Sequence, residues 1–215
     1  MAMPSDYPPV TNSPMRRLPQ LFGGLALYGA SDAMLVRANL GLDPWDVFHQ
    51  GVARQAGWSI GLVVIVVGAV VLLCWLPLRQ RPGFGTLANV VCVGLALDGT
   101  LALLPTVTAI TPRIVLLVGG VLLNGVATAG YIGARLGPGP RDGLMTGLHR
   151  RTGWSLRLVR TGIEVTVLAI GWLLGGNVGV GTVLYALTIG PIAQFFMARF
   201  VFESGQHHRR LESTT

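Results

Sequence analysis

Charged residues are scarce in this chain of 215 residues, and lysine is absent. Only 12% of the residues are charged and 51% are hydrophobic, whereas soluble domains carry about 25% charged residues. All sixteen basic residues are arginines, and they cluster at the ends of apolar runs. A nucleic-acid reader would instead gather basic side chains on one face among base-reading polar groups. The pattern therefore argues against a nucleic-acid partner and predicts a protein of the lipid bilayer.

Cysteines and catalytic motifs are also few. Cys74 and Cys92 lie inside apolar runs, where a thiol behaves as a small hydrophobic side chain. His49 and His149 each lack a second ligand at a spacing that binds metal. The sequence contains no nucleophile elbow, phosphate-binding loop or zinc-protease motif. We therefore expect no disulfide, metal or cofactor, and no enzymatic activity.

Six apolar runs predict an all-α membrane protein with six transmembrane helices. Each run has about the twenty residues needed to cross a hydrocarbon core of roughly 30 Å. With the N-terminus in the cytoplasm, thirteen of the sixteen arginines lie on the cytoplasmic side, which is the usual bias. This predicts a bacterial inner-membrane protein with both termini in the cytoplasm. The runs lie near residues 18–39, 58–78, 85–104, 113–134, 154–175 and 181–202.

The chain repeats itself at a spacing of 96 residues. Between the pairs Arg17/Arg113 and Gly94/Gly190, 26 of 78 aligned positions are identical without a gap. The two units, 16–105 and 112–202, each hold three predicted spans. Because three is an odd number, the second unit must enter the bilayer from the opposite side, so the repeats are inverted. Residues 1–15 form a predicted disordered arm, and residues 203–215 a basic cytoplasmic tail. Inverted repeats suggest a transporter, and the alternative is that the duplication only built a stable six-helix scaffold.

Each repeat also contains a proline-led helix too short to cross the membrane, predicted at 46–56 and 142–152 and expected to be interrupted or re-entrant. Proline prevents a preceding helix from continuing. The aspartate two positions later can cap the new helix, and we favour that role for both aspartates. Alternatively, the positive end of the helix dipole faces an anionic solute. The helix-start residues, which we interpret as gates, are Pro44, Trp45, Asp46, Pro140, Arg141 and Asp142.

A charged stripe marks the predicted fifth span. Arg157, Arg160 and Glu164 are three and four residues apart and therefore share one helix face. Charges in a membrane helix usually face protein or water, so these residues are predicted to bind solute, with Glu164 as a proton or cation relay. The alternatives are a static ion pair between Arg160 and Glu164 and an Arg157 side chain that reaches the interface.

Further polar residues lie in other spans. Asp98 is a candidate for the same solute path and for ion coupling. Asp32 is expected either to pair with Arg37 near the outer interface or to join that path. Five others are expected either to line a cavity or to form interhelical hydrogen bonds: Asn89, Asn124, Tyr131, Tyr185 and Gln194.

Three stretches resemble a known family. They are "LDPWDVFHQGVA", "GPGPRDGLMTGLHRRTG" and "RLVRTGIEVTVLAIGWLLGGNVGVGTVLYALTIGPIAQ". They are similar to the YczE/YyaS/YitT family of bacterial multi-pass membrane proteins, and the resemblance runs from about residue 16 to about residue 200. It implies an integral inner-membrane protein.

Inverted repeats with interrupted helices at matching positions are typical of secondary transporters. The sequence therefore predicts alternating-access transport of a small anionic or zwitterionic solute, driven by an ion gradient. The alternative is a non-transporting accessory protein that supports a membrane enzyme or biosynthetic complex. The expected partners are the lipid bilayer, the solute and, compatible with this composition, further copies of the chain.

Overall fold

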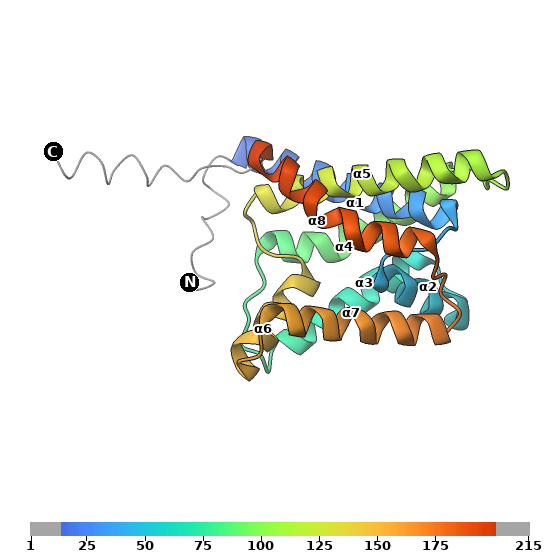
Figure 1. Ribbon diagram of the computed structural model, residues 1–215. Coiled ribbons are helices and arrows are strands. Elements are labelled where there is room, and N and C mark those ends of the chain that lie inside the picture. Colours follow the sequence, from blue (N-terminus) through green and yellow to red (C-terminus); the bar gives the residue numbers. More distant parts are fainter. Residues whose placement is uncertain (1–13, 201–215) are drawn as a thin grey trace.

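The computed structural model describes residues 14–200, and this part of the chain consists of helices and their connections (Figure 1). Of the predicted N-terminal arm, residues 14 and 15 belong to the first helix, and the rest lies outside the described residues, as does the basic tail. The helices are α1 (Pro14–Ala38), α2 (Pro44–Ala56), α3 (Ile60–Trp75), α4 (Phe84–Leu103), α5 (Ile110–Gly133), α6 (Pro140–Thr152), α7 (Leu156–Leu173) and α8 (Val180–Phe200).

Three of these helices, α4, α5 and α8, are long and apolar enough to cross a bilayer. Helices α2 and α3, bent by 112° at their junction, add a fourth span if the pair counts as one. The sequence predicted six spans. The difference arises because α3 has only 16 residues, α7 carries three charges, and polar residues such as Gln20 and Asp32 interrupt α1.

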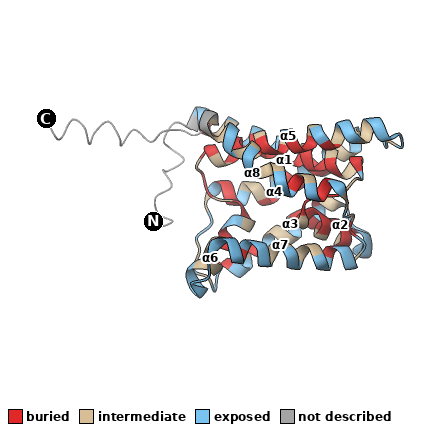
Figure 2. Ribbon diagram, viewed as in Figure 1, coloured by how far each residue is buried: buried red, intermediate tan, exposed pale blue. Residues whose placement is uncertain are grey.

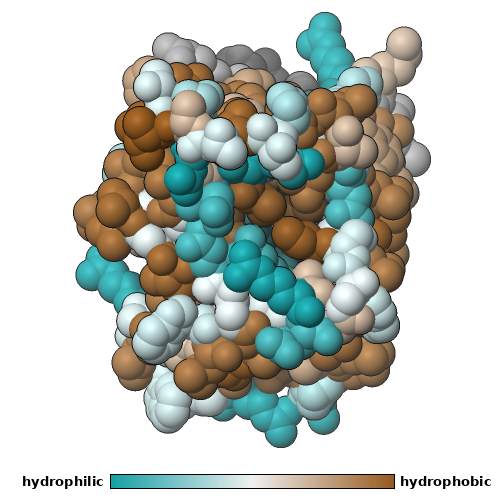
Figure 3. Space-filling view, turned by 90° about the vertical axis from the view of Figure 1, so that its right-hand side faces the viewer, coloured by the Kyte–Doolittle hydropathy of each residue, from teal (hydrophilic) through white to brown (hydrophobic). Residues whose placement is uncertain are grey.

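The outer surface has the apolar character of a protein embedded in lipid. Large apolar side chains are exposed along α4, α7 and α8, including Leu95, Trp172 and Leu187, and contiguous apolar surface of this kind marks a membrane or partner contact. Figure 3 views the end of the molecule where α2 lies. Hydrophilic residues there form a band across the middle, with hydrophobic residues on both flanks. The end of the helical bundle is therefore polar and its flanks are apolar.

Helices α1 and α5 lie side by side along the upper edge of the view in Figure 2, with buried residues on both helices. Their backbones approach closely at glycines, since a Cβ added to Gly24 would lie 2.7 Å from the Tyr131 nitrogen. The outer neighbours of this pair are placed alike, with α4 against α1 and α8 against α5. A Cβ on Gly29 would lie 2.4 Å from the Val93 carbonyl oxygen, and one on Gly125 would lie 2.3 Å from Ile192. Small residues thus bring the helices together, as is usual in membranes.

The short helices recur at the spacing of the sequence repeat. Helix α2 spans residues 44–56 and α6 spans 140–152, so both ends are offset by 96 residues. Each ends at a glycine in the left-handed region, Gly57 with φ 69° and Gly153 with φ 73°, a conformation that glycine adopts without strain. In Figure 1, α2 and α6 lie toward opposite ends of the bundle.

The contact between α1 and α4 gives a matched pair of substitutions. We expect Gly29→Ala to lower stability by about 1–3 kcal/mol, because the new methyl group overpacks the interface with α4. Gly23→Ala, in the same helix, is the control, since nothing lies within 4 Å of its added Cβ. Thermal unfolding in detergent should show a lower melting temperature for Gly29→Ala alone. Equal melting temperatures would mean that the contact is looser than described.

Candidate functional site

The start of α2 is fixed by an aspartate outside the helix. Asp43 is the N-cap, and its Oδ1 accepts hydrogen bonds from the backbone nitrogens of Trp45 at 2.7 Å and Asp46 at 2.9 Å. The sequence pattern favoured Asp46 as the cap, but this prediction was wrong, because Asp43 is closer to the free N–H groups of the first turn. The Asp46 carboxylate is therefore available for other contacts.

Arg141 reaches from the start of α6 to the start of α2. Its guanidinium lies 3.7 Å from Asp43 Oδ2 and 3.6 Å from Asp46 Oδ1. It also stacks over the Trp45 ring, 5.0 Å from the ring centroid, as expected for a cation–π contact. Trp45 and Arg141 occupy the same position in the two sequence repeats. The two proline-led helix starts therefore meet through their own first-turn residues.

Behind Arg141 lies a hydrogen-bonded network of buried polar groups. His49 Nδ1 is 3.1 Å from Asp46 Oδ1. Asn124 of α5 donates to Asp32 Oδ1 at 2.9 Å and to Ser31 Oγ at 2.8 Å, both on α1. Tyr185 of α8 donates to Asn124 Oδ1 at 2.9 Å. The network ties α1, α5 and α8 together beside the start of α2.

Three carboxylates of this region converge. One oxygen each from Asp32, Asp43 and Asp46 lies within 4.8 Å of the others, and all three residues are buried. Burial, and after it the neighbouring Asp46 carboxylate, raise the pKa of Asp43 to about 6 against the opposing effect of Arg141. Within residues 14–200, Asp43 Oδ2 and Asp46 Oδ2 are buried without a hydrogen-bond partner. The cluster thus holds more negative than positive charge.

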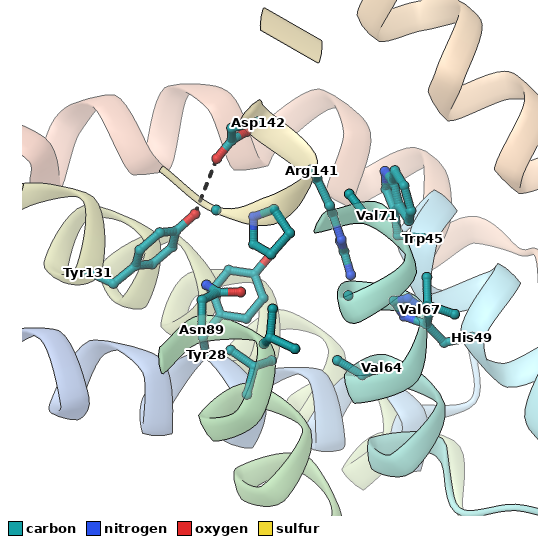
Figure 4. A pocket seen from close by; sticks show the side chains of 15 residues that line it. Tyr28, Trp45, His49, Val64, Val67, Val71, Asn89, Tyr131, Arg141 and Asp142 are labelled. Atoms are coloured by element: carbon teal, nitrogen blue, oxygen red, sulfur yellow. Dashed lines mark hydrogen bonds between the residues drawn. The ribbon is translucent and has the colours of Figure 1, made fainter. Parts of the chain in front are cut away.

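A pocket opens beside the Arg141 side chain (Figure 4). It leaves about 90 Å³ for the centres of water-sized molecules, where one water needs roughly 10–15 Å³. The Tyr131 hydroxyl points to Asp142 at a distance of 3.5 Å on one side, and Trp45 and His49 lie on the other. Valines of α3 and α4 form the apolar wall. The space suits several waters or a small solute with polar and apolar parts.

The predicted charged stripe lies elsewhere. Arg160 Nε donates to Glu164 Oε1 at 2.9 Å, and the two side chains are 60% and 32% exposed. Arg157 is exposed as well. None of the three lines the pocket described above, although Arg160 interacts electrostatically with Asp142 at its edge. The geometry is that of the ion pair the sequence left as an alternative, and a solute-binding role for these residues stays a prediction.

Asp98, which lies in α4, accepts hydrogen bonds from the start of α3. Its Oδ2 accepts from Ser59 Oγ at 2.5 Å and its Oδ1 accepts from the Gly61 backbone nitrogen at 2.8 Å. Asp98 therefore joins α4 to the first turn of α3, and it does not line the pocket. Its predicted role in coupling stays untested.

Several site residues were missed or misplaced by sequence reasoning. Asp32 bonds to Asn124, whereas the Arg37 guanidinium donates to the Leu101 carbonyl at 2.5 Å, so the expected Asp32–Arg37 pair is not formed. His49 was dismissed because it lacks a second metal ligand, yet it bonds to Asp46. One signal was available, because Tyr28 and Asn124 occupy equivalent positions in the two repeats, as do Asn89 and Tyr185. Tyr28 and Asn89 line the pocket, and Asn124 and Tyr185 bond to each other in the buried network.

Comparison with known proteins agrees with a membrane location. A family of unknown function, DUF6198, matches residues 15–198. An uncharacterised protein of Haemophilus influenzae is 42% identical over 82% of this chain and 81% of its own length. The uncharacterised membrane protein YczE of Bacillus subtilis is 34% identical over 84% of this chain and 85% of its own length. The uncharacterised protein YyaS of the same bacterium is 21% identical over 81% of this chain and 89% of its own length. These relatives confirm the predicted family, and no solved structure matches the chain.

The contact of Asp98 predicts a coupled pair of substitutions. Asp98→Asn should lower stability by about 1.5–3 kcal/mol, because it weakens hydrogen bonds to a charged acceptor. In a double-mutant cycle with Ser59→Ala, measured by thermal unfolding in detergent, we expect the two effects to be less than additive. Full additivity would show that the Ser59–Asp98 contact contributes nothing.

Proposed function

The chain belongs to the DUF6198 family, and from this premise we propose that it is a secondary transporter of a small solute in the bacterial inner membrane. The observation that carries the proposal is the meeting of two proline-led helix starts beside a polar pocket. Discontinuous helices of this kind form the binding sites of many transporters, near the midplane of the bilayer.

Two inverted repeats, each with three spans, underlie the proposal. In addition to the recurring helices, equivalent backbone hydrogen bonds recur: Gly85 N donates to Leu136 O, and Gly181 N donates to Leu40 O, both at 2.8 Å. Gly181 lies 96 residues after Gly85, and Leu136 lies 96 residues after Leu40. Each bond therefore joins one repeat to the other, and the two bonds are equivalent when the repeats are interchanged. A two-fold relation about an axis in the membrane plane explains this exchange. It requires six spans, made by α1, α3, α4, α5, α7 and α8.

The repeats differ where transport requires a difference. Helix α3 packs along α4, where a Cβ on Gly61 would lie 2.1 Å from the Gly94 carbonyl oxygen. Helix α7 does not pack along α8 in this way, and the equivalent Gly190 has nothing within 4 Å of an added Cβ. Arg157 stands where the first repeat has Gly61. The contact of α3 with α4 is therefore tighter than its counterpart in the second repeat, and we propose that alternating access exchanges this asymmetry.

The pocket favours a solute with a negative group. Arg141 is its cation, held by Asp43 and Asp46 only at 3.6–3.7 Å, longer than a normal hydrogen bond. A carboxylate or phosphate that forms a bidentate pair with the guanidinium would replace these loose contacts. The nearby Asp142 suits a positive group on the same molecule. We therefore favour a zwitterionic solute over a plain anion.

The α7 surface favours a second candidate function. Arg157, Arg160 and the apolar Trp172 are exposed on a helix that we place in the membrane, and exposed charges there call for a protein or water contact. An accessory protein that binds a membrane enzyme or biosynthetic complex, or a second copy of this chain, through α7 would meet that requirement.

Flux into liposomes separates these readings. With a panel of zwitterionic and anionic metabolites, we expect Arg141→Gln to abolish uptake, because the pocket loses its cation. Glu164→Gln, whose side chain lies outside the pocket, is the comparison and should retain uptake. The reverse result would return the solute path to the charged stripe of α7. Absence of flux in the unaltered protein would favour the accessory role.

Labelling of single cysteines tests the inverted topology. Ala56 and Thr152 occupy equivalent positions at the ends of α2 and α6 and are exposed. In a chain with Cys74 and Cys92 replaced by alanine, a membrane-impermeant thiol reagent should label Ala56→Cys in intact cells. Thr152→Cys should react only after permeabilisation. Labelling of both positions from the same side would contradict two inverted repeats.

A further inference from the structure

The three convergent aspartates lie in the first repeat alone. Asp32 comes from α1, Asp43 from the connection that follows it, and Asp46 from the first turn of α2. Asp32 is 1% exposed, Asp43 is 3% exposed and Asp46 is 0% exposed. The equivalent positions of the second repeat are Thr128, Gly139 and Asp142, so the duplication does not require a triple carboxylate. The presence of three buried carboxylates in the first repeat needs a separate explanation.

The surrounding groups of the described chain do not balance this charge. Arg141 supplies one positive charge at 3.6–3.7 Å from two of the carboxylates. Asn124 donates to Asp32 but is neutral. Asp46 Oδ2 is buried and accepts no hydrogen bond from any group in residues 14–200. A buried carboxylate oxygen without a donor is costly, and Asp46 Oδ2 therefore points to a missing positive ligand.

We propose that Asp32, Asp43 and Asp46 form a binding site for a small monovalent cation, of which Na⁺ is the probe. Oxygen atoms no more than 4.8 Å apart can surround one ion at the ligand distance of roughly 2.3–2.6 Å that a cation of this size, such as Ca²⁺, adopts. A divalent Ca²⁺ fits less well, because it usually takes six to eight oxygen ligands.

The site would couple cation binding to solute binding, and in this respect it rests on the proposed function. Without the cation, Asp43 and Asp46 attract the Arg141 guanidinium. A cation between the carboxylates competes for the same oxygens and weakens that attraction. The guanidinium is then more available for a negative group in the pocket. The two ligands thereby favour each other's binding, as linkage requires.

Thermal unfolding of the purified full-length chain in detergent tests the cation site without any solute. At constant ionic strength, replacement of choline chloride by NaCl should raise the melting temperature in a saturable manner, because the ion binds the folded state. Asp46→Asn should lose this rise, and Asp32→Asn is a second variant in case Asp46→Asn fails to fold. Asp142→Asn, the same substitution at the equivalent position of the second repeat, should retain it.

The outcomes are distinct. A melting temperature that is the same in both salts overturns the proposal, as does an equal sodium effect in all three variants. Stabilisation by CaCl₂ and not by NaCl overturns the monovalent identity. A sodium effect without solute flux in liposomes supports the cation site and contradicts only the transport proposal. The two proposals can therefore be overturned independently.

Discussion

The two halves of the fold are joined by the partly buried guanidinium of Arg141. Arg141 lies in the first turn of α6, but its charge is balanced by Asp43 and Asp46 at the start of α2. Removal of either side would leave uncompensated charge in a low dielectric, which costs several kcal/mol. The two proline-led helices therefore cannot separate independently. Because these helices belong to different repeats, this contact joins the two halves of the molecule at the place where the pocket forms.

The two repeats share close contacts at glycines but differ in several of their charged side chains. Glycines at matching positions allow matching close approaches, such as Gly51 with Leu174 and Gly147 with Leu78. These contacts need little more than small residues, and so the duplication preserved them. The charges of the site were only partly preserved: Asp46 has the equivalent Asp142, whereas Asp32 and Asp43 have no acidic equivalent, and Arg141 stands where the first repeat has a tryptophan. A symmetric scaffold thus carries an asymmetric site, in which opposite charges meet across the repeat boundary.

The sequence predicted the helical class, the family and the short helices to within two residues at their starts, because proline and glycine act locally. It named Trp45, Asp46, Arg141 and Asp142 as gates but assigned solute binding to the charged stripe of α7, which does not line the pocket. The spacing of Arg160 and Glu164 shows that they share a face of α7, but not which face is buried. Asp43 was overlooked because its role comes from capping geometry and from contact with a residue 98 positions away. Long-range pairs of this kind are invisible to periodicity, whereas alignment of the repeats did point to Trp45 and Arg141.

Among the described residues, the contact of Arg160 with Glu164 and that of Arg141 with its two aspartates differ in how easily they can exchange partners. Arg160 and Glu164 are joined by a direct hydrogen bond of 2.9 Å, and their side chains are 60% and 32% exposed on α7, so each already has a strong partner. Arg141 is less exposed and lies beyond hydrogen-bond distance of both its carboxylates. Its charge is confined while its hydrogen-bonding capacity is incompletely used. A ligand that offers two acceptors gains strong hydrogen bonds there without first breaking strong ones. The loosely held, confined pair is therefore better suited to a binding cycle than the exposed one.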